Sequence, residues 1–204
     1  MNTQTPFALA ITGASGAPYA LRLLEVLLAQ GERVDVMISA PGQIVIAMET
    51  GLKLPGRAAE MRRLLAERFS ADDRQLRVFG REEWTAPLAS GSSAPRAMVV
   101  CPCTTGTLAS IAAGSSHNLI ALAADVVIKE GRKLVLVPRE TPFSAIHLEN
   151  MLKLARLGVV ILPPNPGFYQ QPVSLEDLVD FVVARILDQL AIDNDLLPRW
   201  GDSA

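Results

Sequence analysis

The stretch Phe7–Gly16 reads FALAITGASG, an apolar run that passes directly into a turn of small residues. A helical pattern over Ala17–Gln30 follows this turn. An open α/β sheet binds anions at such a junction, because glycine lets a ligand approach the backbone and the free N–H groups at the helix start point at it. The glycine spacing is GxxG and not the GxGxxG of dinucleotide binders. The stretch therefore predicts a phosphate pocket that follows the first strand.

The end of the second predicted strand narrows the ligand class. Val34–Ile38 is followed by Ser39. A nicotinamide enzyme usually places Asp or Glu there to bind the ribose hydroxyl. A small hydroxyl group leaves room and does not repel a phosphomonoester. The pattern therefore predicts a mononucleotide site, with FMN ahead of NAD.

Composition limits the class of protein. The chain has 204 residues, 50% of them hydrophobic, which suits one compact domain over residues 1–204. The formal net charge is −2, so we expect neither nucleic acid nor an anionic membrane surface as a partner. No apolar run reaches the ~18 residues of a membrane span, and Met1–Phe7 lacks the features of a signal peptide. Cys101 and Cys103 are too close for an ordinary disulfide, and we interpret them as packing residues of a cytoplasmic protein.

Apolar runs alternate with helical periodicity along the chain. The expected strands are uniformly apolar, as in parallel sheets covered on both faces: Phe7–Ile11, Val34–Ile38, Ala97–Cys101, Leu134–Val137, Val159–Leu162 and a shorter edge strand Leu76–Phe79. The expected helices are Ala17–Gln30, Gly42–Thr50, Ala58–Phe69, Thr107–Ala113, Ile120–Lys129, Ser144–Leu157 and Leu175–Leu190. This order predicts a Rossmann-like three-layer αβα sandwich with a mostly parallel sheet.

Segments that follow the strands should meet at one sheet edge, where such folds bind ligands. These segments are Gly13–Gly16, Ser39, Pro102–Thr107, Pro138–Glu140 and Pro163–Tyr169. Their small residues and hydroxyls suit a phosphorylated, mostly neutral ligand. The chain has no HExxH motif and no clustered His and Asp residues, so we expect no metal.

Several motifs together resemble one family. They are ITGASGA (11–17), ASGSSAP (89–95), VCPCTTGTLA (100–109), AADVVIKE (123–130), LVLVPRETPF (134–143), HLENMLKL (147–154), PPNPGFYQQP (163–172) and LLPRW (196–200). The chain is similar over nearly its whole length to the UbiX-type flavin prenyltransferases. The resemblance implies that the chain joins dimethylallyl phosphate to reduced FMN, first at N5 and then by ring closure at C6. The product, prenylated FMN, is the cofactor of a UbiD-type decarboxylase, as in ubiquinone biosynthesis. The family fold is the Rossmann-like flavoprotein sandwich, and its members form homo-dodecamers.

The resemblance also implies which residues contact the flavin. Ser15 is implied to lie nearest N5 of the flavin. The helix start at Thr104 is suited to a phosphate by its hydroxyls and N–H groups, although ordinary capping by threonine is the alternative. The implied flavin-binding residues are Gly13, Ala14, Ser15, Ser39, Thr104, Thr105, Gly106, Thr107 and Arg139.

The prenyl phosphate needs cations, because its leaving group is a dianion. Lys129, Arg139 and Arg185, with the hydroxyl of Tyr169, match the family's phosphate group. Lys129 could instead be a helix C-terminal lysine that faces the dipole, and Arg185 could lie on a solvated helix face. A loop that contains Ser90 and Gly91 is expected to cover the site or to be a passive connection.

Ring closure must remove a proton from an aromatic carbon. Glu49 and Glu140 are the candidate bases, and the phosphate released from the substrate is a third. Trp200, in the tail 191–204, is implied to form an aromatic wall over the prenyl group, or alternatively to anchor the C-terminus. Two other functions stay open: an FMN-dependent cysteine decarboxylase of the same fold, and a non-catalytic flavin carrier.

Overall fold

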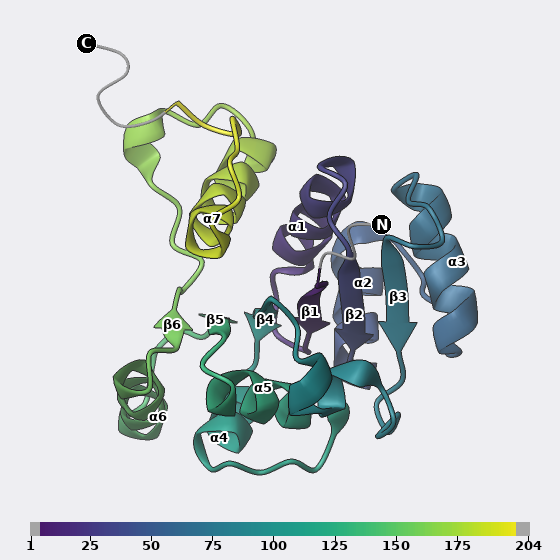
Figure 1. Cartoon of the computed structure of the whole chain (residues 1–204). Helices are drawn as coiled ribbons and strands as arrows, with labels where there is room; N and C mark the ends of the chain where they lie inside the picture. The colour runs from purple at the N-terminus through teal and green to yellow at the C-terminus, as the bar shows by residue number, and fades with distance from the viewer. Residues whose placement is uncertain (1–4, 199–204) are drawn as a thin grey trace.

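The computed structural model describes residues 5–198 and contains one six-stranded sheet with the strand order β3-β2-β1-β4-β5-β6 (Figure 1). Every neighbouring pair of strands is parallel, which confirms the predicted α/β class. The strands are β1 (Phe7–Ile11), β2 (Val34–Ile38), β3 (Leu76–Phe79), β4 (Ala97–Cys103), β5 (Lys133–Pro138) and β6 (Val160–Ile161).

Helices cover both faces of the sheet, because the strands are apolar on both sides. In β1, Phe7, Leu9 and Ile11 pack into one hydrophobic cluster, whereas Ala8 and Ala10 pack into the other. The first cluster lies under α1 (Ala17–Ala29), α2 (Ala40–Thr50), α3 (Ala58–Arg68) and α7 (Leu175–Leu190). The second lies under α4 (Thr105–Ala112), α5 (Leu119–Lys129) and α6 (Ala145–Arg156). Among the described residues, no helix is both long and apolar enough to cross a membrane.

The strand order places a topological switch point between β1 and β4. The chain builds β1, β2 and β3 outward in one direction, and then returns to add β4, β5 and β6 on the other side of β1. The connections after β1 and β4 therefore leave in opposite directions and open a crevice at the carboxyl ends of these strands. Ligands of open α/β sheets bind in this crevice.

Two helices begin two residues earlier than the sequence pattern predicts. Helix α2 starts at Ala40 and not at Gly42, and α4 starts at Thr105 and not at Thr107. In α2 the early start is possible because Pro41 stands in the first turn, where a proline lacks no needed hydrogen bond. The shift makes Ser39 and Thr104 the N-cap residues of α2 and α4, directly at the switch point.

A buried ion pair joins the edge strand β3 to β2. The carboxylate of Asp35, which is 2% exposed, accepts hydrogen bonds from Nε of Arg77 at 2.7 Å and from its terminal nitrogen at 2.6 Å. Burial raises the pKa of Asp35, while the Arg77 guanidinium lowers it. The charge of Asp35 is therefore tolerated because Arg77 neutralises it.

We predict that Arg77→Met lowers the free energy of unfolding by about 3 kcal/mol at pH 7, because it leaves a buried carboxylate unpaired. Loss of the guanidinium raises the folded-state pKa of Asp35 further. The cost of ionised Asp35 is absent below its ordinary pKa and grows as the pH rises, so the deficit should shrink as the pH falls toward 4. Urea unfolding at several pH values measures this trend. The double variant Asp35→Val/Arg77→Met should recover most of the loss, and a deficit independent of pH would contradict the assignment.

Candidate functional site

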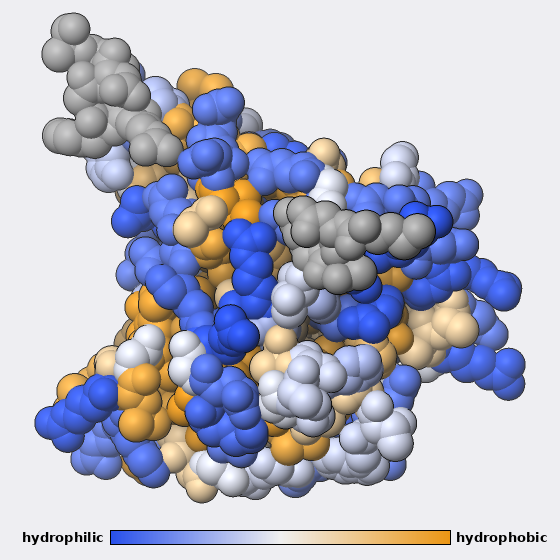
Figure 2. Space-filling view, in the orientation of Figure 1, coloured by the Kyte–Doolittle hydropathy of each residue, from blue (hydrophilic) through white to orange (hydrophobic). Residues whose placement is uncertain are grey.

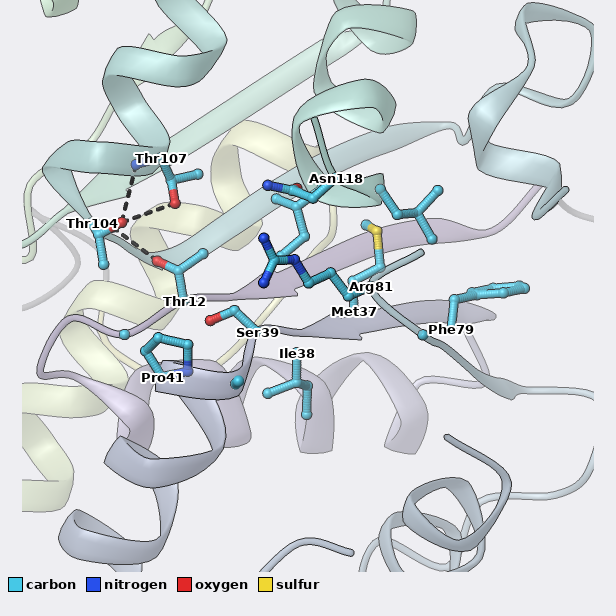
Figure 3. Close-up of a pocket in the computed structure, with 15 residues that line it drawn as sticks. Thr12, Met37, Ile38, Ser39, Pro41, Phe79, Arg81, Thr104, Thr107 and Asn118 are labelled. Carbon is cyan, nitrogen blue, oxygen red and sulfur yellow. Dashed lines mark hydrogen bonds between the residues drawn. The ribbon is translucent and has the colours of Figure 1, made fainter. Parts of the chain in front are cut away.

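A cavity of about 250 Å3 opens at the switch point (Figure 3). It is lined by residues at the carboxyl ends of β1, β2, β3 and β4, together with the start of α5: Thr12, Gly13, Met37, Ile38, Ser39, Ala40, Pro41, Phe79, Gly80, Arg81, Thr104, Thr107, Asn118, Leu119 and Ile120. Four of the predicted site residues, Gly13, Ser39, Thr104 and Thr107, thus meet in one place, as their positions after strands predict.

Three helix N-termini converge on this cavity. Ser39 caps α2 by accepting the Gly42 N–H at 3.0 Å, and Thr104 caps α4 by accepting the Thr107 N–H at 3.1 Å. Asn118 caps α5 by accepting the N–H of Ala121 at 3.0 Å. Each N-terminus carries a partial positive charge of roughly half an elementary charge. The local field in the cavity therefore favours an anion.

Thr12 fixes the geometry between β1 and β4. Its buried hydroxyl donates to the carbonyl oxygen of Pro102 at 2.7 Å and accepts the Thr104 N–H at 2.8 Å. The Thr12 side chain therefore holds the end of β1 to the end of β4. The Thr104 hydroxyl in turn donates to Oγ1 of Thr107 at 2.9 Å, so the hydroxyl proton of Thr107 remains available to a ligand.

Among the described residues that line the cavity, Arg81 is the one with a charged side chain, and none has a carboxylate. The Ser39 hydroxyl, which accepts a backbone N–H, also keeps its own proton for a ligand. Met37, Phe79 and Leu119 form an apolar wall beside these donors. The residues present thus fit a ligand with a phosphate group and a flat apolar part. Pockets that enclose a whole ligand of this kind are typically about 300–1,000 Å3, so this cavity holds part of it.

The turn Gly13–Gly16 differs from the expectation that its helix start binds a phosphate. The Glu49 carboxylate accepts the N–H groups of Gly16 at 2.9 Å and of Ala17 at 2.8 Å. The N-terminus of α1 is therefore occupied by a side chain from the end of α2, and the N-termini that line the cavity are those of α2, α4 and α5. This capping contact is a structural role for Glu49. Its participation in chemistry stays a prediction.

Arg139 lies beside this turn. Its Nε donates to the carbonyl oxygen of Ser15 at 3.3 Å, and its backbone N–H donates to the carbonyl of Cys103 at 3.3 Å. Ala14 is buried in the same turn, while the Ser15 side chain is exposed. Glu140 follows Arg139 and lines a separate shallow cavity with it. The structure thus brings Ser15, Arg139 and Glu140 to one side of the switch point. Thr105 and Gly106 form the first turn of α4.

Tyr169 and Arg185 lie together, but away from the cavity at the switch point. Tyr169 belongs to the short helix η3 (Phe168–Gln170), which Figure 1 shows at the upper left, apart from the sheet. Its ring packs edge to face on Phe181 at 5.9 Å, and it lines a hollow with Arg185, Asp188 and Pro198. Arg185 donates to Asp188 at 2.7 Å. This cluster is a second polar surface and not part of the first cavity.

Lys129, Ser90 and Gly91 lie at the opposite end of the fold within this chain. Helix α5 begins at the cavity and runs for 11 residues, about 16 Å, to Lys129, close to the start of β5. There Lys129 donates to Glu130 at 2.5 Å. A Cβ built on Gly91 would stand 2.1 Å from Glu130 Oε1 and 2.7 Å from Lys129 Nζ. These residues form one cluster at the amino edge of the sheet, so a single chain does not bring them to the cavity. Trp200 lies outside the described residues.

The two cysteines have the inert environment predicted for packing residues. Cys101 and Cys103 are fully buried and unpaired. Burial raises the pKa of the Cys101 thiol far above its usual range and that of Cys103 to about 12. Both thiols therefore remain protonated and unreactive at neutral pH. In residues 5–198 no group of three or more His, Cys, Asp or Glu side chains is placed to hold a metal ion.

Sequence reasoning missed three polar residues of the cavity. Thr12 follows the first strand directly, and Asn118 precedes the apolar run of α5, so both carried a positional signal that was not used. Arg81 lies two residues after the edge strand, in a segment where the sequence predicts neither a helix nor a strand. The carboxyl end of β3 is the signal that could have found it.

The sequence profile of the Flavoprotein family matches residues 1–187, so the class of this protein is that of the flavoproteins. The flavin prenyltransferase UbiX of Pseudomonas aeruginosa is 60% identical over 194 residues, which cover 95% of this chain and 93% of that protein. UbiX of Halalkalibacterium halodurans is 46% identical, with 96% and 93% covered. The chain belongs to the UbiX flavin prenyltransferase family.

Solved structures agree with this assignment. AnUbiX (PadA1), in complex with FMN and dimethylallyl pyrophosphate, is 37% identical with a TM-score of 0.86, and the match covers 98% of this chain and 100% of that chain. A dodecameric FMN-dependent Ubix-like decarboxylase from Escherichia coli O157:H7 is 40% identical with a TM-score of 0.85, with 96% and 98% covered. The peptidyl-cysteine decarboxylase EpiD, at 13% identity and a TM-score of 0.58, covers 93% of this chain and 99% of its own and shares the fold alone.

Proposed function

We propose that this protein is a flavin prenyltransferase that joins dimethylallyl phosphate to reduced FMN and releases prenylated FMN. The observation that carries the proposal is the cavity at the switch point, where three helix N-termini and Arg81 meet and no residue of the described lining is acidic. The cavity occurs in a chain of the UbiX family, whose relative AnUbiX is bound to FMN and a prenyl diphosphate. FMN is therefore a substrate here, as the acceptor of the prenyl group.

Two regions of the chain bind the acceptor FMN, one its phosphate end and the other its ring. Ser39, Thr104, Thr107 and the first turn of α4, with Thr105 and Gly106, bind the phosphate end in the cavity. The ring end extends from the cavity along the Gly13–Ser15 turn toward Arg139, because Arg139 already contacts that turn. Ser15 and Glu140 then border the reacting side of the ring, and Glu140, Glu49 or the released phosphate accepts the proton that ring closure removes.

A second copy of the chain completes the site in this proposal. Lys129, Ser90 and Gly91 lie at the amino edge, so they reach a flavin only in a neighbouring subunit. Large hydrophobic side chains are exposed on α6, where Figure 2 shows orange residues at the lower left: Ile146, Leu148 and Leu152. Ile44 and Met48 are exposed on α2. Such apolar faces favour a homo-oligomer, and the dodecameric relative supports a dodecamer.

The recipient of the product and the location also belong to the proposal. Prenylated FMN would pass to a UbiD-type decarboxylase. The two unpaired cysteines favour the reducing cytoplasm. We further propose that residues 1–204 form one catalytic domain and that the tail 191–204 contributes to the active site through Trp200.

Anaerobic incubation with reduced FMN and dimethylallyl phosphate, followed by mass analysis of the flavin, tests the activity. We expect the mass of FMN to increase by one prenyl unit, and the pure protein to release no CO2 from an aromatic acid. Bound but unmodified FMN would indicate a flavin carrier. Oxidative decarboxylation of a cysteine peptide would indicate the other enzyme class of this fold.

We predict that Arg185→Ala lowers prenyl transfer about tenfold through weaker binding of the prenyl phosphate, while FMN affinity is unchanged. A charge-assisted hydrogen bond contributes about 1.5–3 kcal/mol, and the exposure of Arg185 places its effect at the lower end. Tyr169→Phe should act in the same direction. Asp188→Asn is the matched control, because it frees Arg185 from its ion pair and should not raise KM. A fall in FMN affinity with normal prenyl phosphate kinetics would contradict the assignment.

A further inference from the structure

Arg81 extends into the cavity from the loop that follows β3. Figure 3 shows its guanidinium between Asn118 and Ser39, directed toward the hydroxyls of Thr12 and Thr107. Within residues 5–198 the structure gives this guanidinium no ion pair and no hydrogen bond, unlike the guanidinium of Arg77 or Arg185. A cation of this kind at the mouth of a cavity can bind a ligand without first breaking a contact.

The backbone holds Arg81 in this position. Its carbonyl oxygen accepts the Leu119 N–H at 3.0 Å, which ties the loop to the first residue of α5. The Glu83 carboxylate accepts the Gly80 N–H at 3.0 Å, so this acid of the loop is engaged with the backbone. These hydrogen bonds hold the loop in place, and the Arg81 side chain points into the cavity.

The surroundings of Arg81 match a phosphate dianion. The N-caps Ser39, Thr104 and Asn118 bring three helix N-termini to the same space, and the hydroxyl protons of Ser39 and Thr107 are available. The helix termini supply partial charges, whereas Arg81 supplies a full charge and a planar pair of donors that fits two phosphate oxygens.

We propose that Arg81 is a specificity-determining residue that binds the 5′-phosphate of the acceptor and so selects FMN over riboflavin. This inference rests on the proposed function, since it assigns the phosphate end of the flavin to the cavity. Ser39 and the α4 turn hold the phosphate from the interior, and Arg81 holds it from the rim. Riboflavin lacks the phosphate, so it gains nothing from Arg81.

Fluorescence titration of wild-type protein and Arg81→Gln with FMN and with riboflavin tests the inference. We expect Arg81→Gln to weaken FMN binding about tenfold and to leave riboflavin binding unchanged, because an exposed charge contributes modestly. Arg81→Lys keeps the charge but loses the planar pair of donors, so its FMN affinity should lie between those of wild-type protein and Arg81→Gln. Arg63→Gln, on the exposed face of α3, is the matched control and should behave as wild type. The effect on FMN should diminish as salt rises.

Two results would overturn the inference. An equal loss of affinity for both flavins would mean that Arg81 holds the ring or the loop, and unchanged affinity for both would remove it from the site. In either case wild-type protein would still prenylate FMN, so the proposed function would stand. Wild-type protein that binds neither flavin would overturn both.

Discussion

Gly13→Ala is expected to weaken FMN binding by at least about a hundredfold. A Cβ on Gly13 would stand 2.3 Å from Cβ of Pro41 and within 3.4 Å of its backbone, and a proline in the first turn of a helix cannot rotate away. Relief therefore requires the start of α2 to move, and Ser39 moves with it. Displacements near 1 Å at a binding site can cost about a hundredfold. Equilibrium titration with FMN measures the loss.

The same substitution should cost about 1–3 kcal/mol of stability, as overpacking usually does. Urea unfolding therefore belongs beside the titration, to establish that the variant is folded when it fails to bind. Gly56→Ala is the control, because a Cβ at Gly56 meets no atom within 4 Å. FMN affinity equal to wild type in a folded Gly13→Ala protein would show that the approach of α2 to the turn does not shape the site.

Lys129→Met is expected to slow prenyl transfer by about a hundredfold or more while FMN binding persists. The leaving phosphate loses a cation that acts when its charge develops, and removal of one such group commonly costs ~100–1,000-fold in rate. Single-turnover kinetics with reduced FMN and dimethylallyl phosphate measure it. Lys53→Met, on an exposed loop, is the charge-matched control.

Gly91→Ala gives an independent test of the same cluster. An added Cβ would collide with the ends of two flexible side chains, Glu130 and Lys129, and not with the backbone. The fold should therefore be unaffected, while the position of Lys129 shifts and prenyl transfer slows.

Mixed oligomers of Lys129→Met and Arg185→Ala subunits add a further test. If the two residues serve one site from different chains, the mixed oligomers should recover activity. Full activity of Lys129→Met would exclude the residue from the reaction.

The sequence predicted the sheet well because its central strands are buried on both faces. Runs such as Val34–Ile38 are uniformly apolar, and the observed strand has the same bounds. Helix starts were less predictable. Pro41 and Gly106 look like helix breakers in a sequence, yet both lie in first turns, where no intrahelical hydrogen bond is lost.

Some residues of the site were also more predictable from the sequence than others. Ser39 and Thr104 were predictable because they follow strands of the sheet centre, and topology brings strand ends together. The carboxyl end of β3 could have placed Arg81 near the switch point, but the direction of its side chain was not predictable, because an irregular loop has no periodicity. Lys129 was assigned by family resemblance, which carries no position. Lys129 is the last residue of α5, and β5 begins at Lys133. This closeness to the start of a strand already places Lys129 at the amino edge of the sheet.

The contact of Glu49 with the start of α1 also limits how this fold can be redesigned. In dinucleotide-binding proteins the pyrophosphate lies at the N-terminus of the helix after the first strand. Here a tethered carboxylate takes the N–H groups of Gly16 and Ala17, and it never dissociates from the chain. Conversion to a nicotinamide enzyme therefore requires more than an acid in place of Ser39. The internal anion must also be removed, and with it the link between the end of α2 and the start of α1.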